Sequence, residues 1–172
     1  MKRIEGLLEL LVADGPASDD SDRLMEFGRF VGSWELDVSY FGADGSEERT
    51  TAKWQWEWVL GGRAILDVLM LPTRPPAPPT DGYHTLLRVF DASQGRWKVV
   101  WIAPQHSIVY KLTGSFTNDG GVVLLSDPGE DEPSKWVFSE VTDDTFLWEG
   151  FTMDAPDNEW RLEQRMTARR TS

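Results

Sequence analysis

The chain has 172 residues, a formal net charge of −12 and no cysteine. Its length suits a single domain with a core of its own. The acidic balance argues against nucleic acid and anionic membranes as partners, and the lack of cysteine excludes disulfides, thiolate catalysis and cysteine-bound metals. Because the sequence holds two histidines, His84 and His106, which leave little room for a histidine-rich metal site, we expect no metal and no cofactor.

Residues 1–20 are predicted to form a short helix followed by a linker. Apolar residues recur at helical spacing between Ile4 and Leu11, while Glu5 and Glu9 interrupt the apolar stretch in a way that a secretion signal rarely tolerates. No stretch reaches the roughly twenty apolar residues that span a bilayer. We therefore expect a cytoplasmic protein, and we predict that the polar run ending near residue 20 is a mobile linker.

A second short helix is predicted before the first strand. It begins at Ser21 or Asp22, either of which has a side chain suited to cap it, and it ends at Gly32. One stripe of this helix is apolar and consists of Leu24, Phe27, Phe30 and Val31.

From Trp34 onward the apolar residues recur at every second position. The clearest example places Trp54, Trp56 and Trp58 on one side of a strand and polar residues on the other. Clusters of glycine, aspartate and asparagine divide this part of the chain into ten predicted strands. These span residues 34–41, 49–60, 63–71, 82–91, 97–103, 107–116, 121–126, 134–141, 145–153 and 159–170.

These one-sided strands and their short connections favour an all-β fold with an antiparallel, up-and-down order. Closing such a sheet into a barrel hides every apolar face and removes both edges. We therefore predict that residues 21–172 form one closed antiparallel β-barrel. A two-sheet sandwich is the alternative. The pattern leaves open which face of strands 63–71 and 82–91 points inward.

Residues 71–80 contain five of the ten prolines in the chain. Such a segment favours an extended polyproline conformation and cannot pair as a central strand. It serves either as a stiff connector or as a lid over the mouth of the barrel.

Three stretches of the chain form a recognisable combination. The Gly-x-Trp sequence Gly32-Ser33-Trp34 follows a short helix within residues 27–34, and two further stretches lie at 58–68 and 160–170. Together they resemble the calycin superfamily, which contains the lipocalins and the fatty-acid-binding proteins. Within it, they are most similar to a bacterial lipocalin-like family of unknown function, and the resemblance covers nearly the whole chain.

The resemblance implies a closed barrel with a short helix near one end, and it brings no known reaction. It further implies that Trp34 packs inside one end of the barrel beside a basic residue of the last strand. Arg161, Arg165 or Arg169 is expected to supply this structural cation–π contact. The residues assigned to the structural motif are Gly32, Trp34 and Arg63.

The aromatic faces favour binding of a small, largely apolar molecule inside the barrel. The three tryptophans of strand 49–60 either fill the core or line a pocket. An inward polar group such as Gln164 would fix the orientation of a bound molecule. The predicted ligand-binding residues are Trp54, Trp56, Trp58, Trp101, Tyr110 and Gln164.

The second hypothesis is a small barrel enzyme, of isomerase or cyclase type, that acts on a hydrophobic substrate with one acid or base. Its catalytic candidates are Asp67 and His106. Asp67 interrupts an apolar run, and it either pairs with Arg63 or Arg88 or, if buried alone, has a raised pKa. His106 lies in a predicted loop. There it acts either as a general base or as a haem ligand, or it is a plain surface histidine.

The third hypothesis is a homodimeric interaction protein. Nine tryptophans are many for one small interior, so an aromatic surface patch could drive association. The sequence lacks the dinucleotide, triphosphate and serine-hydrolase fingerprints. It therefore favours a binding protein, while the ligand and any catalysis stay open.

Overall fold

The computed structural model describes residues 2–72, 81–154 and 158–172. The α-helices of the described residues are α1 (Lys2–Leu11) and α2 (Ser21–Gly28), and a short 3-10 helix, η1 (Pro104–His106), follows the fifth strand. The strands of the described residues are β1 (Gly32–Phe41), β2 (Glu47–Val59), β3 (Ala64–Pro72), β4 (Asp81–Asp91), β5 (Arg96–Ala103), β6 (Ile108–Phe116), β7 (Val122–Ser126), β8 (Ser134–Ser139), β9 (Thr145–Asp154) and β10 (Glu159–Arg170). Residues 73–80, which make up most of the proline-rich segment, lie outside the described residues. The predictions of a stiff connector or a lid fall on these residues.

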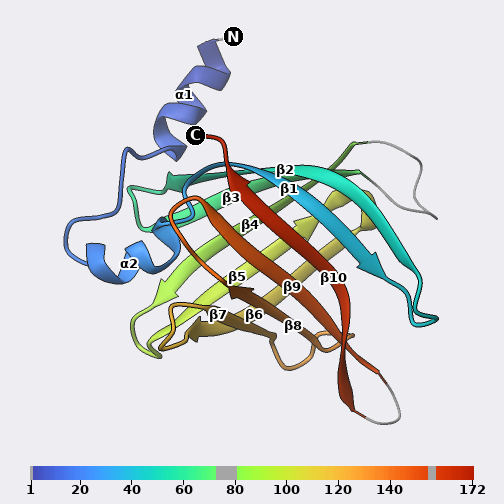
Figure 1. The fold of residues 1–172 in the computed structure, drawn as a ribbon. Coiled ribbons are helices and arrows are strands. Elements are labelled where there is room, and N and C mark those ends of the chain that lie inside the picture. Colours follow the sequence, from blue (N-terminus) through green and yellow to red (C-terminus); the bar gives the residue numbers. More distant parts are fainter. Residues whose placement is uncertain (1, 73–80, 155–157) are drawn as a thin grey trace.

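The strands close into one antiparallel barrel (Figure 1). Each strand pairs with its neighbours in the sequence, and β1 completes the ring by pairing with both β2 and β10. The up-and-down barrel predicted from the two-residue period is therefore confirmed. The two-sheet sandwich is wrong, because β1 and β10 join the two ends of the sheet.

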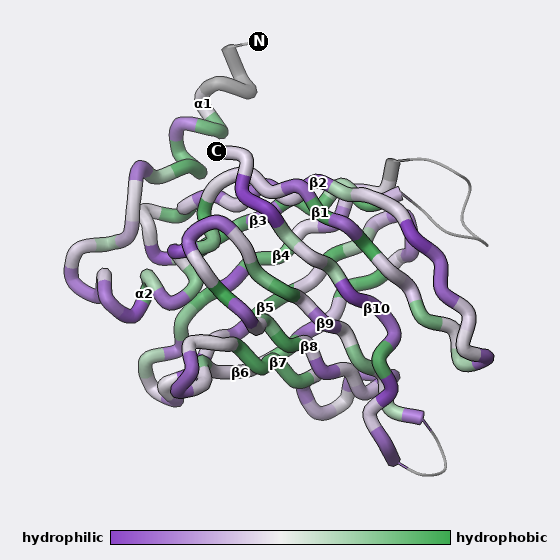
Figure 2. The backbone as a smooth tube through the Cα atoms, viewed as in Figure 1, coloured by the Kyte–Doolittle hydropathy of each residue, from purple (hydrophilic) through white to green (hydrophobic). Residues whose placement is uncertain are grey.

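The alternation along β2 shows how the interior forms. Trp54 and Trp56 are buried, whereas Lys53 before them and Glu57 after them are exposed. Burying a large apolar side chain contributes about 1.5–3 kcal/mol, so strands with one apolar face gain most from a closed sheet. Figure 2 shows hydrophobic and hydrophilic stretches following one another along the strands of the barrel.

The two strands whose inward face the sequence left open are β3 and β4. In β3 the buried residues include Asp67 and Leu69, and in β4 they include His84, Leu86 and Arg88. Each set has the two-residue spacing of one strand face. Three titratable side chains therefore belong to the interior of the barrel.

Helix α2 begins at Ser21, as predicted, but its cap and its end differ from the prediction. Its N-cap is Asp20, whose side chain makes no capping hydrogen bond, so Ser21 and Asp22 are not the caps that we expected. The helix ends at Gly28 instead of Gly32, because the chain turns back there: the amide of Val31 donates to the carbonyl of Gly28 at 3.0 Å. This turn directs the next residues into the barrel.

Helix α2 lies across one end of the barrel (Figure 1). Phe27 on the helix and Phe30 in the turn after it are fully buried. The ring centroid of Phe27 lies 4.9 Å from that of Trp97 and 6.3 Å from that of Trp56. We call the part of the interior that these two phenylalanines fill the closed half, and the part toward the opposite end the open half.

The N-terminal segment runs along the outside of the barrel. Val12 forms a bridge with Val59, and the amide of Ala17 donates to the carbonyl of Gly62 at 3.1 Å. The polar run predicted as a mobile linker is thus hydrogen-bonded to the turn between β2 and β3. No helix in the described part of the chain has the length and apolar character that a membrane span requires.

The Gly-x-Trp motif lies in the closed half. Gly32 has φ of +129°, and a Cβ there would lie 2.6 Å from the carbonyl oxygen of Ser172, so the position requires glycine. The indole N–H of Trp34 donates to the carbonyl of Phe30 at 2.7 Å. The motif therefore joins the first strand to the turn that carries Phe30.

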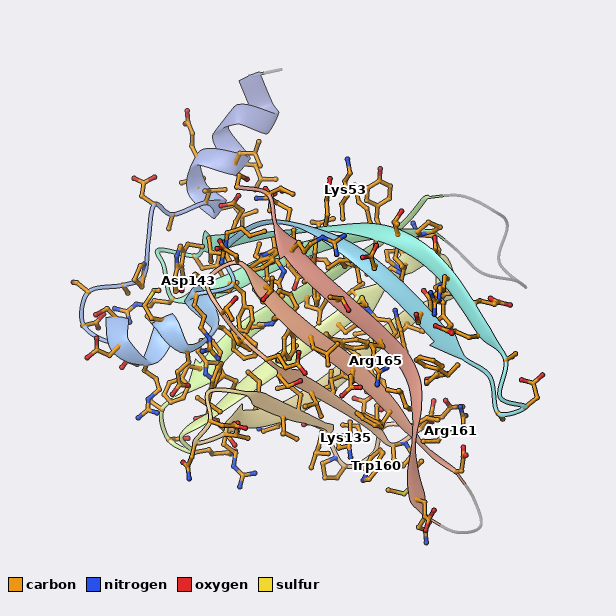
Figure 3. The ribbon with its side chains drawn as sticks, viewed as in Figure 1. Lys53, Lys135, Asp143, Trp160, Arg161 and Arg165 are labelled. Atoms are coloured by element: carbon orange, nitrogen blue, oxygen red, sulfur yellow. The ribbon has the colours of Figure 1, made fainter. Side chains whose placement is uncertain are left out.

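The cation over Trp34 is Arg170, whose guanidinium carbon lies 4.1 Å from the ring centroid. The three expected candidates are wrong, because the pairing of β1 with β10 places Arg170 directly opposite Trp34. Those candidates form ion pairs instead: Arg161 with Asp154, Arg165 with Glu149, and Arg169 with Asp37. Figure 3 labels two of them along β10. Arg63, the third motif residue, pairs with Asp19 at the surface.

Candidate functional site

The open half of the barrel contains a cavity of about 360 Å³. Its wall includes six aromatic side chains, which are Tyr40, Trp54, Trp101, Trp136, Phe138 and Trp148. The ring of Trp136 meets those of Trp101 and Trp148 edge to face, at centroid distances of 5.5 and 5.6 Å. Ligand pockets in proteins range from about 300 to 1,000 Å³ and have mostly apolar walls, so this cavity has the size and surface of a small-molecule site.

Four of the residues singled out in the sequence lie on the cavity wall: Trp54, Trp101, Gln164 and His106. The strands β2, β5 and β10 supply the first three, and the turn after β5 supplies the histidine. These segments are separated by up to 110 positions in the chain, from 54 to 164, and the closed ring of strands brings them together.

The other three predicted ligand-binding residues lie away from the cavity wall. Trp56 is fully buried in the closed half, between α2 and the cavity. Trp58 packs against the backbone of α2, since a Cβ on Gly28 would lie 2.2 Å from its ring. Tyr110 is turned aside, and its hydroxyl donates to the backbone carbonyl of Glu132.

Asp67 and Arg88 form an ion pair inside the barrel, and neither side chain is exposed. Nη1 of Arg88 donates to one carboxylate oxygen of Asp67, and the amide of Leu86 donates to the other at 3.2 Å. Burial raises the pKa of Asp67, while the Arg88 charge and the nearby Trp54 indole oppose that rise. Asp67 is therefore held by Arg88, and it is not among the residues of the cavity wall.

Arg88 itself borders the cavity, and two of its nitrogens, Nε and Nη2, have no hydrogen-bond partner. The ring of Trp56 covers the guanidinium, with its centroid 3.8 Å from the central carbon. The indole nitrogens of Trp54 and Trp56 are also buried without a partner of hydrogen-bond geometry. A buried donor left unpaired costs about 1–3 kcal/mol, and a charged one costs more, so these donors would gain from an oxygen acceptor within reach.

His84 lies on the cavity wall beside His106, with 6.0 Å between the ring centroids. Its other ring neighbour is Trp101, at 5.7 Å. Burial lowers the pKa of His84 to about 4, and the charge of His106 adds to this shift. The His84 imidazole is therefore neutral near pH 7, with one nitrogen able to accept a hydrogen bond.

A β-bulge in β10 changes which side chains reach the cavity. The pairing of β10 with β9 shifts register between Leu162 and Gln164, and both Glu163 and Gln164 contribute to the wall. A bulge turns a side chain that strict alternation would place outside. The carboxylate of Glu163 is exposed, so it stands at the mouth of the cavity.

Some wall residues that we did not predict were nevertheless indicated by the alternation in the sequence. Arg88 shares its alternation face with Leu86, and Trp148 shares one with Phe146, so both could have been placed inside. Glu163 could not, because nothing in the local pattern marks the bulge. Among the described residues, no group of three or more metal-ligating side chains comes together.

No protein-family model and no curated protein matches the chain. Solved structures with a similar fold include the following two. The S-type phycobiliprotein lyase CPES from Guillardia theta is 13% identical, with a TM-score of 0.61 over 85% of this chain and 90% of that chain. Rv2717c from M. tuberculosis is also 13% identical, with a TM-score of 0.62 over 91% of this chain and 99% of that one. At this identity the likeness supports the barrel fold alone.

Proposed function

We propose that the protein binds one small, largely apolar molecule in the open half of its barrel. The observation that carries the proposal is the 360 Å³ cavity with its aromatic wall. An apolar molecule that moves from water into such a cavity gains about 25 cal/mol for each Å² that it buries. The rings are already held by the strands, so little side-chain freedom is lost on binding.

The polar groups on the wall support the same function. Most of them lie toward the mouth, where the wall includes His84, His106, Glu163 and Gln164, and Arg88 lies toward the closed half. A largely apolar pocket with a small number of placed polar groups is the usual construction of a ligand site, in which those groups set orientation.

The test is a titration with the neutral, apolar dye phenylnaphthylamine, excited through the tryptophans. We expect saturable binding of one dye per chain, with energy transfer from rings of the wall. The variant Leu86→Trp fills the cavity and is expected to abolish this binding. Its control is Leu125→Trp on the exposed outer face, which is expected to leave it unchanged. Circular dichroism shows whether each variant is folded. Absence of saturable binding to wild type, or full binding to folded Leu86→Trp, would contradict the proposal.

An acid–base enzyme is the second candidate, and the neutral imidazole of His84 on the cavity wall is the observation that favours it. His84 replaces Asp67 as the candidate acid or base, because the Asp67 carboxylate is held by Arg88. The test compares hydrolysis of an apolar nitrophenyl ester by wild type and by His84→Asn. Equal rates in the two proteins would remove His84 from any such role.

A further inference from the structure

The Arg88 guanidinium is fully buried, and the donors on one of its edges are left without hydrogen-bond partners. Asp67 accepts a hydrogen bond from Nη1, and the ring of Trp56 covers one face. The ring of Phe27 lies 5.2 Å from the same central carbon. The edge that carries Nε and Nη2 has no hydrogen-bond partner, although the side chain is completely buried.

These two nitrogens are neighbours on one edge of the planar group, and their N–H bonds run nearly parallel. Such a pair forms a fork that matches an oxygen acceptor held in the same plane. Arg88 belongs to the cavity wall, and its contacts with Trp56 and Phe27 place it toward the closed half. An acceptor carried by a molecule in the cavity could therefore satisfy both donors.

Charge decides which acceptor fits. Asp67 already neutralises Arg88, so a carboxylate bound to the fork would leave one net negative charge inside the barrel. Glu163 at the mouth and the net charge of −12 on the chain would add repulsion during entry. A neutral carbonyl oxygen supplies the lone pairs without adding a charge.

We propose that the molecule bound in the cavity carries a neutral carbonyl oxygen at its inner end, and that Nε and Nη2 of Arg88 donate to it. This inference rests on the proposed binding function and specifies its ligand class as apolar ketones, esters or amides. The aromatic wall holds the apolar body, and the fork fixes which end of the molecule enters first.

The test uses three naphthalenes of nearly equal shape that differ at one atom group. Acetylnaphthalene carries a ketone, isopropenylnaphthalene replaces its oxygen by a methylene, and naphthoate carries a carboxylate. Calorimetric titration of wild type is expected to rank the ketone first, at least about tenfold tighter than the hydrocarbon, as for one hydrogen bond to a charged donor. The carboxylate is expected to bind more weakly than the ketone.

Two variants locate the effect at Arg88. Arg88→Lys keeps a positive charge beside Asp67 but has no fork, and the double variant Asp67→Leu/Arg88→Met removes both charges. Each is expected to bind ketone and hydrocarbon about equally, within roughly twofold. The matched control Arg63→Lys changes an exposed arginine and is expected to keep the ketone preference.

The outcomes separate this inference from the function on which it rests. Saturable hydrocarbon binding without a ketone preference would overturn the inference alone and indicate that a trapped water satisfies the fork. If naphthoate bound most tightly of the three probes, the claim that the oxygen acceptor is neutral would be overturned. A ketone preference that persists in both Arg88 variants would show that another group receives the oxygen. Failure of all three probes to bind would overturn the proposed function as well.

Discussion

The two halves of the barrel interior are built from the same kind of strand, but one is a filled core and the other contains a cavity. In the closed half, aromatic rings fill the space, as Phe30 does between Trp56 at 5.4 Å and Phe146 at 5.1 Å. In the open half, the rings of Trp101 and Trp136 meet edge to face and leave a cavity beside them.

Helix α2 accounts for the difference. It delivers Phe27, and the turn after it delivers Phe30, into one end of the barrel. No helix or turn in the described part of the chain fills the other end in this way. A two-residue pattern therefore predicts that a face points inward, but whether that face meets a solid core or a hollow depends on an element outside the sheet.

The largest expected effect is at the boundary between the halves, where Asp67 pairs with Arg88. Arg88→Met leaves a buried carboxylate without its partner, and we expect the free energy of unfolding to fall by about 4 kcal/mol. Asp67→Leu/Arg88→Met removes both charges and is expected to recover most of that loss. Urea unfolding measures both, and a double variant less stable than the single one would contradict a pair that acts as a unit.

The next prediction compares the effect of removing one aromatic ring from each half. Phe27→Ala removes a fully buried ring from the closed half and is expected to cost about 3 kcal/mol of unfolding free energy. Trp101→Ala, at a half-buried position on the cavity wall, is expected to cost about half as much and to weaken dye binding more strongly. Unfolding and dye titration of both variants test this. If both variants lost equal unfolding free energy and equal dye affinity, the claim that the closed half stabilises the fold and the open half binds the dye would be contradicted.

Gly32 tests the attachment of the closed half to the first strand. Gly32→Ala forces a Cβ into a position with φ of +129° and against the Ser172 carbonyl, at an expected cost of about 2 kcal/mol. Gly95→Ala is the matched control. Its φ is +64° with open space around it, so we expect a loss of about 1 kcal/mol. Thermal unfolding compares the two, and an equal loss would mean that the Ser172 contact adds nothing.

His84 gives the open half a pH dependence. Its pKa is about 4 when folded and near 6.5 when unfolded, so the unfolded chain binds more protons between these values. Stability contributed by neutral His84 is therefore present above pH 6.5 and is lost as the pH falls toward 4. Allowing for solvent at the cavity mouth, we expect a loss of about 1 to 2 kcal/mol across this range, and a smaller one in His84→Asn. Unfolding curves at several pH values check this, and identical pH slopes would contradict it.

The fold was predictable because alternation along strands such as β2 is a local property, and closure follows from hiding one-sided faces. The cation over Trp34 was not, because the opposition of Trp34 and Arg170 is set by the register between the first and last strands. The same limit applies to the site. Trp54 and Trp56 share one strand face, and only the position of α2 separates the wall residue from the buried one.

The central claim is that a small apolar molecule enters the open half and no other part of the barrel. Nuclear Overhauser effects between bound phenylnaphthylamine and the methyl groups of the protein test it most directly. We predict contacts from the dye to Leu69, Leu86 and Met166, all on the cavity wall, and none to Leu36 in the barrel interior away from that wall. Dye contacts confined to the exposed leucines of α1, such as Leu10, would contradict the account.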